Sequence, residues 1–171
     1  MNLTQFTAHG PFKIPSSRLP SGSKTIRPMH AQAFWAEHGL YANKVGVYVF
    51  AIRAGGGVTP MYVGKATKSF AQESYSTDKL NKYFNAMGQY KRGTPVMFFV
   101  AYPKKAGAVN AKHIGALEKF RIQQGRIVNS KLLNKVHAKL PTWGISGALR
   151  SKTKKPTKQA AGFRDTFALA G

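Results

Sequence analysis

Two short strand-like runs, Gly46-Val47-Tyr48 and Tyr62-Val63-Gly64-Lys65, each place a tyrosine close to a glycine. Far downstream, Glu118 lies in a stretch that is otherwise nearly free of acidic residues. A phenol can orient or activate water, an ammonium can bind an anionic oxygen, and a carboxylate can hold a divalent cation. Together these groups suit hydrolysis of a phosphate ester, a reaction in which negative charge must be stabilised on the phosphoryl oxygens.

The charge balance indicates an anionic partner. The chain of 171 residues carries 27 lysines and arginines against 5 acidic residues, which gives a formal net charge of +22. Such an excess repels itself in a folded protein, whereas a polyphosphate neutralises it and releases counterions. Nucleic acid, with DNA as the leading candidate, is therefore the expected partner. A structural protein that is basic only to sit in RNA explains the charge as well. No long lysine-rich amphipathic helix supports binding to a membrane surface.

Composition excludes several kinds of site. Because the chain has no cysteine, it has neither disulfides nor thiolate zinc sites. Residues 1–10 contain no apolar signal core, and no apolar run is long enough to span a membrane. We therefore expect a soluble cytoplasmic protein that associates with nucleic acid.

The elements that must position these residues are predicted from periodicity and turn residues. Residues 1–27, rich in Ser, Pro, Gly, Lys and Arg, predict an irregular arm, and residues 28–39 a short helix. β-Branched and aromatic residues at 46–52 and 60–64 predict two strands, which the glycine turn 54–57 connects as an antiparallel hairpin. Since side chains alternate along a strand, the two tyrosines share one face and their aliphatic neighbours form the other.

The second half of the core is predicted to alternate helix, strand and helix. Residues 68–87 indicate a helix in two pieces, with Thr77 capping the second, and residues 95–102 predict a central strand. Asn110 is predicted to cap a helix that Gly125 ends. The expected fold class is α/β of the α+β kind, a small three-stranded, mainly antiparallel sheet flanked by helices. Its parts are a basic arm with a short helix at 1–43, a core domain at 44–135 and a basic extension at 136–171.

The paired triplets in this order of elements resemble those of the GIY-YIG nuclease superfamily, with valine for isoleucine in both triplets. The resemblance covers residues 44–135 and extends to Glu118 and to Asn134 in the run 131–134, with Asn129 as a competing counterpart. It implies a metal-dependent endonuclease that hydrolyses phosphodiester bonds in DNA or structured nucleic acid.

The resemblance assigns a role to each matching residue. Tyr48 is implied to help deprotonate the attacking water, although it equally suits orienting a metal-bound hydroxide. Tyr62 is implied to orient the scissile phosphate, and Glu118 to hold one divalent ion, Mg²⁺ or Mn²⁺. The other matches, implied to approach or contact the substrate, are Gly46, Gly64, Lys65 and Asn134.

One departure from the family concerns an arginine that its members carry on the helix after the second triplet. There it stabilises the phosphate in the transition state, but residues 68–87 contain no arginine. We expect Lys79 or Lys82 to take its place, although an ammonium lacks the forked guanidinium and the exchange is not neutral. The departure also favours a rival function, a catalytically inactive nucleic-acid-binding module on the same scaffold.

The acidic residues favour a single metal ion. They are scattered along the chain, as Glu37, Glu73, Asp78, Glu118 and Asp165. A two-metal nuclease needs clustered carboxylates, whereas Mg²⁺ can be held by one carboxylate, several waters and the phosphate oxygens of the substrate. Glu73 is expected to pair with Lys79 or Lys82, or to be a second ligand. The plain alternative for Glu118 is a surface pair with Lys119 or Arg121.

Two further expectations complete the hypothesis. The basic segments at 12–27 and 150–158 are expected to add non-specific affinity through phosphate contacts. The mechanism also requires Tyr48, Tyr62 and Glu118, far apart in sequence, to converge around one pocket that grips a backbone phosphate.

Overall fold

A computed structural model describes residues 4–90, 92–103, 108–139, 146 and 157–166. The chain divides into two compact units, Met1–Ala138 and Lys139–Gly171. Helix α5 (Lys158–Thr166) belongs to the second unit. Most of the basic segment predicted at 150–158 lies outside the described residues. Within the described part of the chain, no helix combines the length and apolar character needed to cross a membrane.

The first unit contains a main sheet, a small hairpin and four of the described helices. The strands are β1 (Thr7–Lys13), β2 (Ser17–Arg18), β3 (Lys24–Thr25), β4 (Gly46–Ala54), β5 (Gly57–Ala66) and β6 (Thr94–Ala101). The helices are α1 (Pro28–Ala42), α2 (Phe70–Glu73), α3 (Thr77–Gln89) and α4 (Ala111–Val128). The main sheet is antiparallel in the order β1-β6-β4-β5, and β2 pairs with β3 separately. The mixed α and β architecture is as predicted, but the sheet has four strands, not three.

The fourth strand comes from the segment for which the sequence predicts an irregular arm. β1 pairs with β6 at the edge of the sheet, with a bulge between His9 and Phe12. Gly10 lies in this bulge at a φ of +111°, and a Cβ there would lie 2.7 Å from the carbonyl oxygen of Met97. The Gly10-Pro11 pair that makes the segment loop-like thus marks a bulged edge strand, a position where sheets tolerate both residue types.

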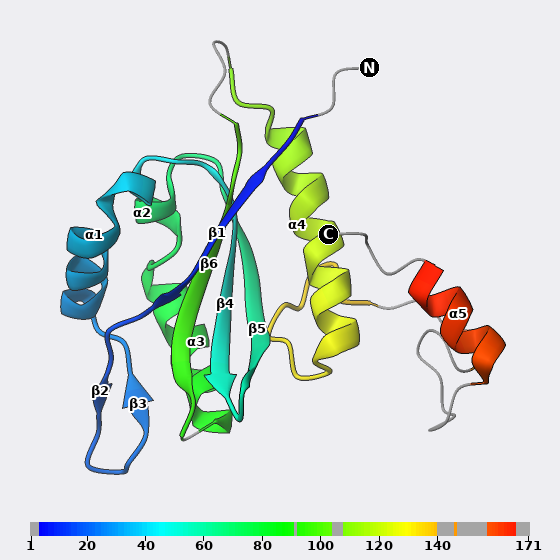
Figure 1. Cartoon of the computed structure of the whole chain (residues 1–171). Coiled ribbons are helices and arrows are strands. Elements are labelled where there is room, and N and C mark those ends of the chain that lie inside the picture. Colours follow the sequence, from blue (N-terminus) through cyan, green and yellow to red (C-terminus); the bar gives the residue numbers. More distant parts are fainter. Residues whose placement is uncertain (1–3, 91, 104–107, 140–145, 147–156, 167–171) are drawn as a thin grey trace. The chain divides into compact units, whose positions relative to one another are not determined.

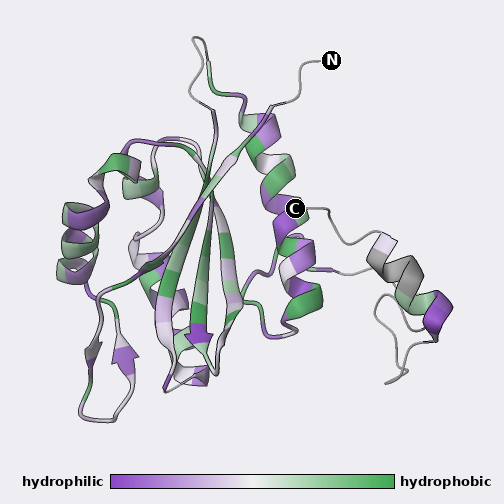
Figure 2. Ribbon diagram, viewed as in Figure 1, coloured by the Kyte–Doolittle hydropathy of each residue, from purple (hydrophilic) through white to green (hydrophobic). Residues whose placement is uncertain are grey.

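The main sheet carries helices on both faces (Figure 1). Helices α1, α2 and α3 cover one face, over a core that includes Phe34, Tyr48, Phe50 and Tyr83. Helix α4 covers the other face and packs mostly on β5, over a smaller aliphatic core. Long hydrophobic stretches run through the central strands in Figure 2. Because both faces are covered, burial of apolar surface on each face stabilises the sheet.

Two helices continue past the glycines that predict their ends. α1 changes direction at His38, whose φ of −115° and ψ of 27° are not helical, and it passes Gly39 to reach Ala42. In α4, Gly125 is buried inside the helix, where a Cβ would lie only 3.3 Å from Leu132. Gly125 therefore serves close packing, and a glycine used for packing has the same sequence signature as one that ends a helix.

The predicted two-piece helix and the predicted cap of α4 are both present. α2 and α3 divide the stretch after β5, and α3 has Ser76 at its N-cap, one residue before the predicted Thr77. The side chain of Asn110 accepts hydrogen bonds from the backbone N–H groups of Lys112 and His113. This cap satisfies N–H groups that have no partner inside the helix.

Candidate functional site

Strands β4 and β5 bring the two tyrosines onto one face of the sheet. Tyr48 lies opposite Gly64, and the ring of Tyr62, two residues earlier on β5, lies 6.3 Å from that of Tyr48 between centroids. A Cβ at Gly64 would overlap the phenol group of Tyr48. Gly46 has a φ of +147°, and a Cβ there would overlap the carbonyl oxygen of Val100. Both glycines of the triplets therefore stand where a side chain does not fit.

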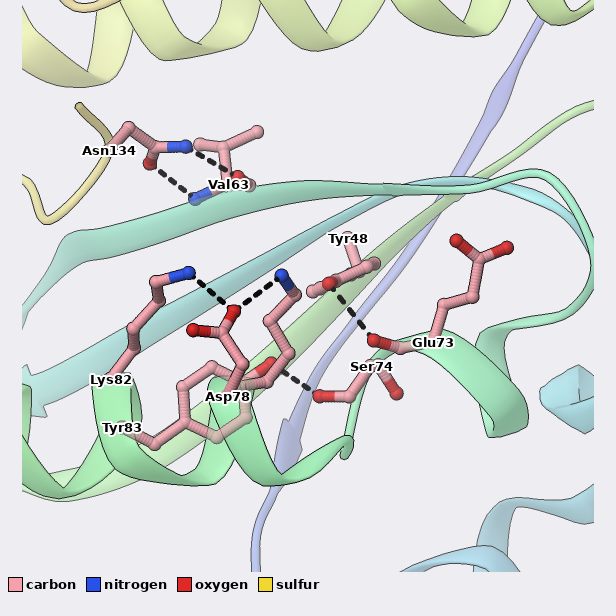
Figure 3. A network of polar contacts seen from close by, with 9 residues as sticks. Tyr48, Val63, Glu73, Ser74, Asp78, Lys82, Tyr83 and Asn134 are labelled. Atoms are coloured by element: carbon pink, nitrogen blue, oxygen red, sulfur yellow. Dashed lines mark hydrogen bonds and ion pairs between the residues drawn. The ribbon is translucent and has the colours of Figure 1, made fainter. Parts of the chain in front are cut away.

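Tyr48 is fully buried beneath this face. Its hydroxyl donates a hydrogen bond of 3.2 Å to the backbone carbonyl of Glu73 (Figure 3). Burial, and then the nearby Tyr62 and the charges of Glu73 and Glu118, raise the pKa of Tyr48 well above its ordinary value. A neutral, buried phenol that donates to the protein suits a positioning role better than proton abstraction from water.

Tyr62 keeps a small exposed surface, 7% of its area, and two lysines of α3 lie over its ring. The Nζ atoms of Lys79 and Lys82 are 5.2 and 5.1 Å from the ring centroid. Both ammonium groups also bind the carboxylate of Asp78, at 3.0 and 2.5 Å. Hydrogen bonds from Lys82 and then Lys79 lower the pKa of Asp78. Two cations over an aromatic floor form a seat for an anion, and the Asp78 carboxylate occupies it.

The predicted pairing of Glu73 with these lysines is wrong. One carboxylate oxygen of Glu73 accepts hydrogen bonds of 2.7 Å from the backbone N–H groups of both Thr67 and Lys68. The single turn of α2 returns Glu73 to the loop after β5, where the carboxylate satisfies amides that the sheet does not pair. Asp78, four residues before Lys82, takes the ion-pair role instead, at a spacing that sequence reasoning missed although it is the usual one for helical ion pairs.

Glu118 and Lys65 form an ion pair on the other face of β5. Glu118 projects from α4, and its carboxylate lies 3.5 Å from the Lys65 ammonium. The glutamate side chain is 15% exposed and the lysine side chain 50%. The ion-pair partner of Glu118 is therefore the residue that directly follows the second triplet, and not Lys119 or Arg121 as in the plain alternative.

Asn134 binds the backbone of the second triplet with both ends of its side chain. Its Oδ1 accepts from the N–H of Val63 at 2.9 Å, and its Nδ2 donates to the Val63 carbonyl at 2.7 Å (Figure 3). Asn129 donates to the Pro60 carbonyl at 2.8 Å. The segment 129–134 thus satisfies the outer backbone groups of the edge strand β5, and Asn134 is the asparagine that meets the triplet.

Together with Asp78, the predicted residues form two clusters, and this arrangement corrects the expectation of one pocket. The phenol cluster lies on the α3 side of β5 and consists of Tyr48, Tyr62, Asp78, Lys79 and Lys82. The carboxylate cluster lies on the α4 side and consists of Lys65, Glu118 and Asn134. Side chains alternate between the two faces along a strand, and Tyr62 and Lys65 are separated by an odd number of positions. They therefore lie on opposite faces. Because β5 is the edge of the sheet, only this one strand separates the clusters, and the charge of Glu118 acts on Tyr48 across it.

In the carboxylate cluster, Glu118 is the residue that could hold a metal ion. In the described ranges no three His, Asp or Glu side chains gather closely enough to form a metal cage. Glu118 offers one partly exposed carboxylate beside a lysine. That donor set suits Mg²⁺, which keeps most of its waters and takes further oxygens from a substrate phosphate.

Comparison of the chain with protein-family models, curated proteins and solved structures finds no significant match. The contacts around β5 therefore carry the functional argument.

Proposed function

We propose that this chain is a metal-dependent endonuclease that hydrolyses phosphodiester bonds with a single divalent ion, Mg²⁺ or Mn²⁺, and that DNA is its substrate. One observation carries the proposal: four consecutive residues of β5, 62–65, each contact a residue expected at the site. The contacts are Tyr62 with Lys79 and Lys82, Val63 with Asn134, Gly64 with Tyr48, and Lys65 with Glu118. Residues spread over 87 positions of the chain, from 48 to 134, thus meet at one short strand segment.

The site binds phosphate with the lysines on either side of the β5 edge. Lys65 lies on the α4 side, and Lys79 and Lys82 lie on the α3 side. A nucleic-acid backbone that passes this edge is attracted by the ammonium groups of both clusters, and each cluster stabilises charge on the phosphate oxygens nearest to it. Three point charges offer less geometric control than one arginine fork, so we expect a slow enzyme.

The residues divide into substrate-contacting and positioning groups. Tyr62, with its exposed margin and its two ammonium neighbours, contacts the phosphate region. Tyr48 and Asn134 position β5 from its two sides through contacts made inside the protein. Glu118 would hold the metal ion, which when bound supplies positive charge and an acidified water.

The test is cleavage of supercoiled plasmid, linear duplex and structured RNA, with Mg²⁺ or Mn²⁺ and with chelator. We expect nicked plasmid with metal and intact plasmid with chelator. The Glu118→Gln variant keeps the side-chain shape but removes the charge, and should lower cleavage by about 100-fold or more while binding is retained. Glu37→Gln, at an exposed carboxylate of α1, is the matched control and should cleave like the parent.

Two outcomes count against the proposal. If Glu118→Gln cleaves as fast as the parent, the activity comes from another site or from a contaminant. If the parent binds all three substrates but cuts none of them with either metal, the chain is not a nuclease.

The non-catalytic binding module is a second candidate that one observation favours. Lys79 and Lys82, the proposed substitutes for the missing arginine, are both engaged by Asp78. A module of this kind binds nucleic acid equally well with and without Mg²⁺ and leaves it intact. A structural protein that sits in RNA would prefer structured RNA over duplex DNA in the same assay.

A further inference from the structure

The β2–β3 hairpin concentrates positive charge at positions that oppose one another. Arg18 and Lys24 are direct cross-strand partners, an arrangement in which like charges are destabilising. Burial lowers the pKa of Lys24, and the charges of Arg18 and then Lys13 lower it further. Among the described residues, no ion pair involves Lys13, Arg18 or Lys24. The carboxylate of Glu73 is bound to backbone amides instead. The hairpin therefore carries a repulsion that an external anion would relieve.

The hairpin is anchored firmly to the body of the first unit. Ile14 before it and Ile26 after it are buried in the main core, at 1% and 4% exposure. The Nζ atom of Lys24 donates to the carbonyl of Gly93, at the start of the β6 segment. Its turn is closed by a backbone hydrogen bond of 2.8 Å from Leu19 to Ser23. The hairpin backbone and the Lys24 side chain are thus held in place before any partner arrives, which reduces the entropy lost on binding.

We infer that the β2–β3 hairpin, together with Lys13 at the end of β1, is a preformed wing that binds the phosphate backbone of nucleic acid through Lys13, Arg18 and Lys24, apart from the β5 site. The inference deepens the proposed function, since it rests on nucleic acid as the substrate and adds a second contact surface. Lys24 uses one of its three donors on Gly93 and keeps two for an anion. Arg18 and Lys13 are exposed.

The chemistry of the hairpin fits a phosphate backbone better than other anionic surfaces. Its tip, Pro20-Ser21-Gly22, is small, and β3 is drawn as hydrophilic in Figure 2. It offers no aromatic ring to enter a lipid interface or to stack on an unpaired base. Contacts of cations with phosphates carry no sequence information, so the wing sets affinity and orientation without selecting a sequence.

Helix α3 connects the wing to the β5 site. Lys79 and Lys82 lie in its first two turns, and the helix also contacts β3. Figure 1 shows the hairpin extending past the end of the main sheet near α3. The 13 residues of α3 span about 20 Å at 1.5 Å per residue, a length of about six base pairs. One duplex segment can therefore reach both surfaces.

The test compares two double variants of equal charge. Lys13→Gln with Arg18→Gln removes two cations of the wing, and Lys112→Gln with Lys119→Gln removes two exposed cations of α4. Fluorescence anisotropy gives the Kd for a 30-base-pair duplex over a range of salt concentrations. For the wing variant we expect the log–log salt slope to fall by about 1.8 and the affinity at 0.1 M salt to fall about 60-fold. The α4 variant should lose only a small part of that.

Measurements of Tm and of the cleavage rate distinguish weaker binding by the wing variant from misfolding or loss of activity. Because the wing variant removes repulsion between like charges, its Tm should equal or exceed that of the parent, and its cleavage rate at saturating substrate should be unchanged. A lower Tm would assign the cations a structural role and overturn the inference. Equal losses in the two double variants, an unchanged salt slope, or wing-dependent binding that is as tight to phosphatidylserine vesicles as to DNA, would each overturn it as well. If the parent binds but never cleaves while the wing variant loses its slope, the wing stands and the nuclease proposal fails.

Discussion

Gly64 of β5 lies directly opposite Tyr48 of β4, and the phenol of the tyrosine fills the space that a side chain at position 64 would need. The glycine of one triplet and the tyrosine of the other are therefore a packed pair. The hydroxyl of Tyr48 reaches past Gly64 to the carbonyl of Glu73, at the end of α2. A side chain at position 64 would therefore displace the ring of Tyr48 and disturb its hydrogen bond to α2.

The first prediction concerns this packed pair. In Gly64→Ala the methyl group overlaps a fully buried ring, and we expect the free energy of unfolding to fall by about 1–3 kcal/mol. Gly115→Ala is the matched control, because a Cβ at that position of α4 meets no atom within 4 Å. The control should raise the free energy of unfolding by about 0.5–1 kcal/mol. Urea denaturation measures both, and a Gly64→Ala variant as stable as the parent would show that Tyr48 moves aside freely.

The fold could be predicted where local chemistry and tertiary packing agree. The β-branched and aromatic residues of β4, β5 and β6 and the cap at Asn110 all indicate the elements that form. Strand β1 could not be predicted because Gly10-Pro11 is typical of a loop. Only the long-range pairing with β6 makes this segment a strand. Gly125 is read as a helix end because its partner, Leu132, is recognisable only after the chain has folded back.

The site could be predicted residue by residue but not in its arrangement. The triplets, Lys65 and Asn134 lie together at β5, while the contacts with substrate that the resemblance implies for them stay predictions. The division into two clusters follows from α4 packing on the opposite face from α3, and no local pattern records which face a helix covers. The hydrogen bonds between Glu73 and two backbone amides depend on the path of the loop after β5, which no local pattern records either.

The second prediction concerns stability at high pH. Tyr48, Tyr75 and Tyr83 are buried, and burial raises the pKa of each phenol. The folded state therefore binds these protons more tightly than the unfolded chain, whose tyrosines titrate near pH 10. Their contribution is complete below about pH 10 and is lost as the pH rises above it. Above about pH 10, each buried phenol should make the free energy of unfolding fall by about 1.4 kcal/mol per pH unit.

The check is urea denaturation from about pH 9 to about pH 11.5. Tyr83→Phe should reduce the slope of the free energy of unfolding against pH by about 1.4 kcal/mol per unit above pH 10, and should leave it unchanged below about pH 9. The hydroxyl of Tyr83 donates to the Ser74 carbonyl at 2.6 Å, so the variant is also less stable at every pH. The comparison therefore uses the slope of the free energy of unfolding against pH. Identical slopes above about pH 10 in Tyr83→Phe and the parent would contradict a raised pKa of Tyr83.

The third prediction separates a positioning role of Asn134 from substrate contact. Asn134→Ala removes two hydrogen bonds to Val63, and the free energy of unfolding should fall by about 2 kcal/mol, with slower cleavage even at saturating substrate. Asn134→Asp keeps the acceptor for the Val63 N–H but opposes its carbonyl, so it should not restore the parent values. Asn85→Ala, at an exposed position of α3, serves as control. A stable Asn134→Ala protein that only binds substrate more weakly would indicate direct contact instead.

The last prediction concerns the anion seat of the phenol cluster. Asp78 holds the ammonium groups of Lys79 and Lys82 over Tyr62, where a substrate phosphate has to bind. The carboxylate is an exposed competitor, so Asp78→Asn should free both lysines for the phosphate. We expect the salt slope for duplex DNA to steepen by about 0.9 and the affinity at 0.1 M salt to rise about 8-fold. Glu37→Gln changes the net charge equally at a carboxylate on α1 and should leave both quantities near the parent values. Weaker binding by Asp78→Asn would mean that the carboxylate orders the lysines for the substrate, and an equal gain in both variants would reduce the effect to net charge.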